Sequence, residues 1–443
     1  MALLESSYKS IWKIAYPIII GSFAQSIISV TDTAFMGRIG SVEQAAIGMV
    51  SVYYLILFMI GFSYTKGTQI FVARRLGERR YDEIGKIIDN SLMVMFGFSL
   101  LLFVFLRFFA EDTLSLIIKD PAILQASVTF LEVRSYGIVF GFCGSLFLSF
   151  YMGIGNTNII LLSILTMSGL NVLLNYVLIF GKFGFPQLGI QGAAWASNIA
   201  EIVAAAIFVS HAIIAKYYEK FKLFKFKFSG AIIKDVTNLS FPIVMQTFIG
   251  LLAWMIFFIF VEKMGTQALA ISSVVKSIYT IFGIPAWGFS SAANTIVSNL
   301  MGQKRPDEVS KAIKRIVVFS MGFTALLALP IIFFPEAFMR FYTVDETVIV
   351  GGRHVIYVCM GALLIYSSST IMFNGIVSTG TSKVSLGIEV IAVIVYLGYI
   401  WSIFQIENVS LPLVWTAELF YWFAIATISF VYLKTGRWKT KQI

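Results

Sequence analysis

Long apolar stretches follow one another along almost the whole chain, and only short polar segments separate them. A helix needs roughly 20 apolar residues to cross a hydrocarbon core about 30 Å thick, and each stretch reaches that length. The pattern therefore predicts twelve membrane-spanning helices. Their expected ranges are 11–38, 45–75, 87–109, 124–152, 159–181, 190–215, 239–262, 268–299, 313–334, 351–377, 383–404 and 411–433.

The sequence also contains an internal repeat. An offset of 225 residues aligns Pro17 with Pro242 and places the polar segment 77–86 over 302–311 without a gap. Each half holds an even number of spans, so both halves enter and leave the membrane on the same side. We therefore expect an all-α polytopic membrane protein, with two six-helix lobes related by a pseudo-twofold axis along the membrane normal.

This repeat divides the chain into three expected parts. They are an N-terminal lobe over 1–215, a basic cytoplasmic linker over 216–238 and a C-terminal lobe over 239–443. Lysines alternate with aromatic and aliphatic residues in the linker, so we expect it to lie along the cytoplasmic membrane face, attracted to acidic headgroups.

Composition and charge support a membrane protein. Hydrophobic residues make up 58% of the chain and charged residues only 13%, against roughly a quarter charged in soluble domains. The net charge of +10 could indicate nucleic acid, but 23 of the 33 Lys and Arg residues fall in the two termini and every second loop or at the span ends that border them. Because cytoplasmic loops are enriched in Lys and Arg, we expect both termini inside the cell and no nucleic-acid partner.

The sequence lacks the motifs of several classes of protein chemistry. Residues 1–10 lack the charged start, apolar run and cleavage site of a signal peptide, so we expect the first span to direct insertion. No Gly-x-x-x-x-Gly-Lys-Ser/Thr loop is present to bind ATP. Cys143 and Cys359 lie in apolar stretches, and His211 and His354 near span ends. We expect no catalytic residue and no cofactor, and an ion gradient as the energy source.

Asp32 is the intramembrane acid that stands out. Ionisable residues within a membrane are costly and usually serve function or an ion pair. Asp32 lies in the first span on a face shared with Gln25 and Ser29, and its repeat partner is Phe257. This broken symmetry favours an ion site in the N-terminal lobe.

Polar groups in two other spans could complete that site. Asn171 and Asn175 are four residues apart and project from one helix face, and Ser197 adds a hydroxyl in the sixth span. A carboxylate, two amides and a hydroxyl suit Na⁺, held by Asp32, Asn171 and Asn175, or a proton carried by Asp32. The alternative is that the two Asn residues only form hydrogen bonds between helices. No other metal site is indicated.

Further polar residues are candidates for the substrate cavity. Gln25, Lys66, Lys276 and Glu389 all fall within spans. Each lysine could pair with an intramembrane acid or contact an anionic or zwitterionic substrate. Pro17 frees a backbone carbonyl fifteen residues before Asp32, so we expect it to act as a hinge coupled to the charge of Asp32.

The chain resembles the multidrug and toxic compound extrusion (MATE) family over nearly its full length. Six segments carry the resemblance: Ala15-Tyr-Pro17, Thr31-Asp32-Thr33-Ala-Phe-Met-Gly37, the Gly-Phe-Ser…Gly-Thr-Gln69…Leu-Gly77 end of the second span, Gly-Ile-Gly155-Asn-Thr, Asn171-Val-Leu-Leu-Asn175 and Gly189-Ile-Gln-Gly-Ala-Ala-Trp-Ala-Ser197. The resemblance implies twelve helices in two lobes, a V-shaped central cavity, and export of organic cations in exchange for Na⁺ or H⁺.

It also marks Asp32 as the ion-coupling acid and places Asn171, Asn175 and Ser197 at ion-site positions. Family members often carry Asp where Asn175 stands and Thr where Ser197 stands. One branch carries Glu in the seventh span, where this chain has Gly250, and Asp in the tenth span, which has no acid here.

Three functions are weighed on these grounds. The favoured one is a monomeric antiporter in a bacterial inner membrane that exports small cationic or amphipathic compounds. The second is a flippase or exporter of a lipid-linked or anionic substrate in the wider MOP superfamily, which Lys66, Arg134 and Lys276 keep open. The third is a membrane transferase, which would need clustered acids or a catalytic His in an ordered loop.

Overall fold

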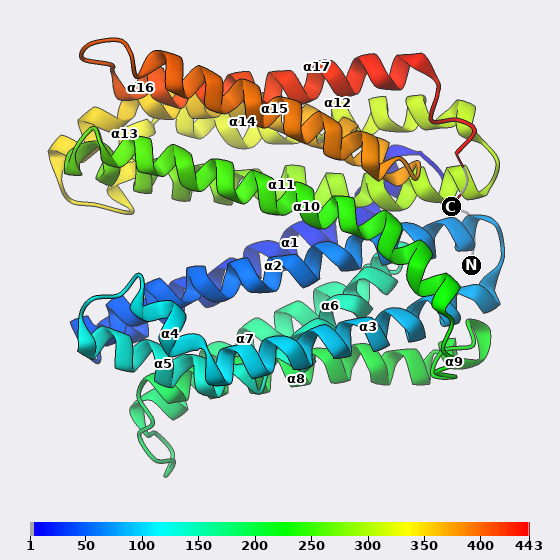
Figure 1. Ribbon diagram of the computed structural model, residues 1–443, viewed down its shortest axis with the longest axis horizontal. Helices are drawn as coiled ribbons and strands as arrows, with labels where there is room; N and C mark the ends of the chain where they lie inside the picture. The colour runs from blue at the N-terminus through cyan, green and yellow to red at the C-terminus, as the bar shows by residue number, and fades with distance from the viewer. Residues whose placement is uncertain (1–3, 442) are drawn as a thin grey trace. The chain divides into compact units, whose positions relative to one another are not determined.

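The computed structural model describes residues 4–441 and 443, and within these residues it contains helices and no strands (Figure 1). The first three residues of the opening segment lie outside the description. Eleven helices are long and apolar enough to cross a membrane, and a bent pair of shorter helices provides a twelfth span. The expected all-α fold with twelve spans is confirmed.

The helices of the first half are α1 (Tyr8–Gly37), α2 (Ser41–Gly77), α3 (Tyr81–Phe108), α4 (Ala110–Ser115), α5 (Pro121–Ser135), α6 (Ile138–Gly153), α7 (Asn158–Phe180), α8 (Ile190–Ile214) and α9 (Tyr217–Lys220). Those of the second half are α10 (Gly230–Glu262), α11 (Thr266–Gly302), α12 (Pro306–Phe333), α13 (Pro335–Arg340), α14 (Glu346–Ser378), α15 (Ser382–Ile403), α16 (Leu411–Trp415) and α17 (Ala417–Thr435).

The chain forms two compact units. One comprises Ile20–Ser240, and the other comprises Phe241–Ile443 together with the residues before Ile20. The boundaries therefore fall inside α1 and α10, each within three residues of a proline, Pro17 or Pro242. Packing of Trp12 against three rings of the second unit, those of Phe289, Phe319 and Phe323, accounts for the place of the first part of α1 in that unit.

The helices repeat at the offset found in the sequence. α2, α3 and α4 begin and end 225 residues before α11, α12 and α13. The turns between the paired helices repeat as well, because Arg79 and Lys304 both adopt a left-handed backbone, with φ of 61° and 58°. The duplication thus extends to single residues of the loops.

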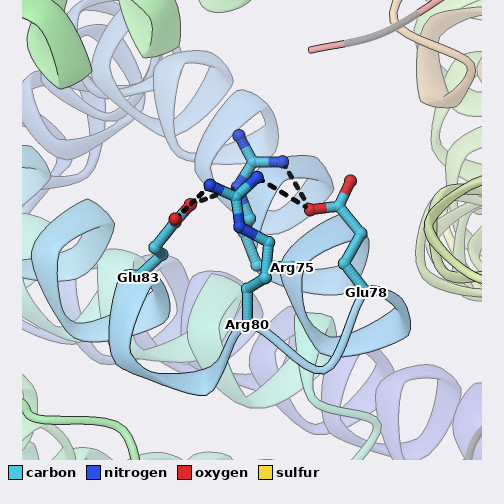
Figure 2. A network of polar contacts seen from close by, with 4 residues as sticks. All are labelled: Arg75, Glu78, Arg80 and Glu83. Carbon is cyan, nitrogen blue, oxygen red and sulfur yellow. Dashed lines mark hydrogen bonds and ion pairs between the residues drawn. The ribbon is translucent and has the colours of Figure 1, made fainter.

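Charged side chains bracket the first of these turns (Figure 2). Arg75 bonds Glu78 at 2.8 Å and Glu83 at 2.9 Å, and Arg80 contacts the same two carboxylates. The second unit keeps the pair between Arg305 and Glu308, at 2.5 Å. Both turns are therefore held by an arginine at the start of the next helix and a glutamate three residues further on.

One span departs from the repeat. α5 and α6 together align with α14, yet they are bent by 57° at the break between them, whereas α14 is continuous. The sequence predicted a single helix over 124–152, because the break at Tyr136 and Gly137 carries no proline. Arg134 lies in the last turn of α5, directly before this break.

The linker packs on α3. The carboxylate of Asp89 accepts hydrogen bonds from the backbone N–H groups of Phe224, Lys225 and Phe226 at 2.7–2.9 Å. The side chain of Phe221 is fully buried, and its carbonyl oxygen lies so close to α3 that a Cβ added at Gly85 would stand only 2.2 Å away.

We predict that Gly85→Ala destabilises the protein by about 1–3 kcal/mol, because the linker backbone would have to move away from α3. Gly97→Ala on the same helix is the matched control, since an added Cβ there meets nothing within 4 Å. The control should be neutral or stabilising by up to about 1 kcal/mol. Thermal unfolding of both purified variants measures the difference, and equal midpoints would contradict the close packing.

Candidate ion-binding site

Three helices bring the predicted ion-site residues together within the Ile20–Ser240 unit. Asp32 lies in the last two turns of α1, Asn171 and Asn175 share one face of α7, and Ser197 lies in the second turn of α8. α7 packs along α8, whose buried face near Ser197 consists of small residues such as Ala193 and Ala196. Small side chains let two helices approach closely in a membrane.

The four side chains form one hydrogen-bonded chain. Asn175 donates through Nδ2 to Asp32 Oδ1 at 2.5 Å and to Asn171 Oδ1 at 3.0 Å. Asn171 in turn donates to Ser197 Oγ at 3.1 Å. Both Asn residues are buried and Asp32 is half-buried. The residues selected from the sequence are therefore neighbours, and their role in holding an ion stays a prediction.

One atom of this cluster is left without a partner. Asn175 Oδ1 is buried and accepts no hydrogen bond from any described residue. Leaving a buried acceptor unsatisfied costs about 1–3 kcal/mol, and such an atom in a native structure often marks an unseen water or ion. An acceptor next to a carboxylate is suited to a bound cation.

A buried ion pair lies beside the cluster and was missed by the sequence analysis. Arg134 of α5 donates to both carboxylate oxygens of Glu201 on α8 and, at 2.7 Å, to Asn198 Oδ1. Its guanidinium also lies 4.4 Å from the centre of the Tyr54 ring. Opposite charges in the fourth and sixth spans were the available signal, but the spacing along the chain does not show which helices touch.

The other candidates do not join this cluster. Gln25 is exposed, and Lys66 on α2 is half-buried with no acid within ion-pair distance among the described residues. In the second unit, Lys276 lies 5.0 Å from the Phe258 ring and likewise has no acidic partner in the described chain. Glu389 accepts a hydrogen bond from Tyr421 at 2.6 Å. Pro17 lies inside α1, which continues through it.

Comparison with known proteins gives the family. The MatE family model matches residues 17–177 and 242–401, one match in each half. A probable multidrug resistance protein NorM of Thermotoga maritima is 23% identical over 346 residues, which cover 77% of this chain and 73% of that protein. A probable multidrug resistance protein YoeA of Bacillus subtilis is 20% identical over 388 residues, covering 85% of this chain and 83% of its own.

Solved structures show the same fold. A MOP superfamily transporter from Pyrococcus furiosus, described as having a binding pocket of reverse polarity, superposes with a TM-score of 0.90 at 16% identity, covering 98% of this chain and 97% of that one. An outward-facing multidrug resistance MATE family transporter gives a TM-score of 0.87 at 16% identity with the same coverage.

These matches remove the transferase hypothesis, because the relatives are named as multidrug resistance proteins and not as enzymes. The family model spans well over half of the chain and matches its two halves separately, as the internal repeat requires. The chain belongs to the MatE family, a family of membrane transporters rather than enzymes.

Proposed function

We propose that this protein is a secondary active exporter that moves organic, cationic or amphipathic compounds out of the cell in exchange for H⁺ or Na⁺. The chain of hydrogen bonds that links Asp32 to Asn175, Asn171 and Ser197 carries this proposal. The names of the relatives as multidrug resistance proteins support the substrate class. The protein acts as a monomer in the bacterial inner membrane, with both termini in the cytoplasm.

The charge of Asp32 distinguishes it from the neighbouring acids. Glu201 is paired with Arg134, and Glu132 is paired with Arg107 at 2.6 Å. Asp32 has no basic partner within ion-pair distance among the described residues. Its hydrogen-bond partner is the neutral amide of Asn175, and the charge of Arg134 acts on it from beyond ion-pair distance. An intramembrane carboxylate that no side-chain cation contacts is suited to bind a mobile cation, such as H⁺ or Na⁺.

Two cations fit this position. Na⁺ would take oxygen ligands from Asp32, from Asn171 and from the unpartnered Oδ1 of Asn175. A proton would bind to the Asp32 carboxylate itself. Both ions neutralise the same charge, so either can be the coupling ion.

α1 connects this charge to the rest of the molecule. Asp32 belongs to the Ile20–Ser240 unit, whereas the part of α1 before Ile20 packs within the second unit. Pro17 lies close to the boundary and lacks the N–H group needed for a helical hydrogen bond. A bend at Pro17 that follows the charge state of Asp32 would couple ion binding to the alternating access of a two-lobed transporter.

A second candidate function rests on Lys66 and Lys276. Both are half-buried in spans without an acidic partner among the described residues, and the transporter of reverse pocket polarity has this fold. An exporter of a lipid-linked or anionic substrate would use such lysines as substrate contacts.

We predict that Asp32→Asn abolishes uptake of fluorescent organic cations into inverted membrane vesicles driven by an imposed Na⁺ or proton gradient. The amide keeps the shape of the side chain and removes the charge that the ion neutralises. Glu132→Gln is the control and should retain uptake, because its carboxylate is paired with Arg107. Full gradient-driven uptake by Asp32→Asn would contradict the role of Asp32. No uptake by folded wild type with either gradient would favour the anionic substrate.

We also predict that Na⁺ raises the unfolding temperature of the wild type more than choline does at equal ionic strength, because an ion that binds only the native state stabilises it. Asn175→Leu should lose this shift, since it removes the unpartnered oxygen, and Asn175→Asp should enlarge it by adding a carboxylate. An unchanged shift in Asn175→Leu would contradict the ligand role of Asn175. No shift in the wild type would assign the coupling role to a proton on Asp32.

A further inference from the structure

The repeat identifies the part of the second unit that corresponds to the ion-binding cluster. At the offset of 225, Asp32 corresponds to Phe257 and Asn171 to Tyr396. α8 and α16 begin 221 residues apart, and this offset places Glu418 opposite Ser197. The Phe257 and Tyr396 rings are in contact, with centroids 6.1 Å apart. The corresponding region of the second unit thus also carries a carboxylate, but on the last long helix instead of the first.

Two buried glutamates lie in this region. Glu418 is 3% exposed and accepts hydrogen bonds from Tyr396 Oη at 3.0 Å and from Trp422 Nε1 at 3.1 Å. Glu389 is 4% exposed and accepts from Tyr421 Oη at 2.6 Å. The Tyr421 ring contacts both Tyr396 and Trp422, with centroids 5.3 and 4.6 Å apart. One aromatic cluster therefore joins the two acids.

No fixed positive charge balances these acids. Neither glutamate forms an ion pair with a Lys, Arg or His anywhere in residues 4–441 and 443. The groups that face Glu418 come from α10, α11, α14, α15 and α17 and are uncharged in their protonated forms. They are Trp254, Tyr279, Cys359, Tyr396, Tyr421 and Trp422. Glu389 faces the hydroxyl of Tyr421. Two ionised carboxylates in such a site would have no opposite charge to offset their burial.

One of the facing groups has a hydroxyl oxygen without a hydrogen-bond partner among the described residues. The Tyr279 hydroxyl faces Glu418, and its side chain is more than nine-tenths buried. Its oxygen has no hydrogen bond to any described residue. A tyrosine hydroxyl can both donate and accept a hydrogen bond. Tyr279 can therefore donate to an ionised Glu418 and accept from a protonated one, so it can serve both states of a carboxyl group that gains and loses a proton.

The groups around Glu418 also decide whether Na⁺ or a proton fits this site. Trp422 Nε1 can only donate a hydrogen bond, and the hydroxyls of Tyr396 and Tyr421 already donate to the two carboxylates. Na⁺ would require several further oxygen ligands, whereas a proton requires only the carboxylate and one acceptor. We propose that Glu389 and Glu418 form a second proton-binding site, in which each carboxylate takes up a proton from water and releases it to water during the transport cycle.

The packing around Glu389 supports a site built for this acid. α10 carries Gly250 next to it, and a Cβ added there would stand 3.2 Å from Glu389 Oε1. The glycine on α10 thus leaves the space that the carboxyl group from α15 occupies. This second site is separate from Asp32, so it stands or fails independently of the function proposed for that residue.

Infrared difference spectra of the purified full-length protein, recorded between low and high pH, test this proposal. The carbonyl stretch of a carboxylic acid appears only when the group is protonated. We expect the wild type to show a pH-dependent carbonyl band that loses one component in Glu418→Gln and another in Glu389→Gln. Glu407→Gln, in an exposed loop, and Asp32→Asn should retain both components.

Tyr396→Phe provides a second test that keeps both acids and serves if a Gln variant fails to fold. Loss of the hydrogen bond to Glu418 should shift its band without removing it. The proposal is overturned if no pH-dependent component disappears in either Gln variant, or if Tyr396→Phe leaves the spectrum unchanged. A loss of ion coupling in Asp32→Asn alone, with both components retained, would support two separate sites.

Discussion

The hydrogen bond between Asp32 and Asn175 connects the first span to the polar side chains of α7 and α8. An ionised carboxylate within a membrane span is costly unless a partner neutralises it, and here the partner is a neutral amide at 2.5 Å. The same amide also binds Asn171, and its own oxygen stays without a donor. An acid next to an unpartnered acceptor is the arrangement that the proposed ion coupling requires.

The neighbouring charged residues differ from Asp32, because they neutralise one another. Arg134 and Glu201 satisfy one another in the same unit, at the bend that separates α5 from α6. A pair that is already neutral has little use for a mobile ion, so it serves structure or sets the local field. Glu389 and Glu418 resemble Asp32 instead, because neutral donors surround them. The two halves of a duplicated chain have thus placed unbalanced acids on different helices.

Much of the fold could be predicted from the sequence. An apolar stretch long enough to cross the membrane identifies a span, and the internal repeat identifies which spans of the two halves correspond. Asp32, Asn171, Asn175 and Ser197 could be selected because their types and spacing fit one site. The bend at Gly137 had no proline to reveal it. The partners of Arg134 and the surroundings of Glu418 depend on which helix faces touch, and helix packing decides this independently of the spacing along each helix.

Ion coupling at Asp32 means that each organic cation exported is exchanged for H⁺ or Na⁺. Adding a fluorescent organic cation to proteoliposomes that contain the wild type, with no ion gradient imposed, tests it most directly when H⁺ and Na⁺ are recorded on both sides of the membrane. We expect one of these ions to move against the direction of the substrate, and Asp32→Asn to abolish this movement. Substrate transport without any countermovement of H⁺ or Na⁺ would contradict it.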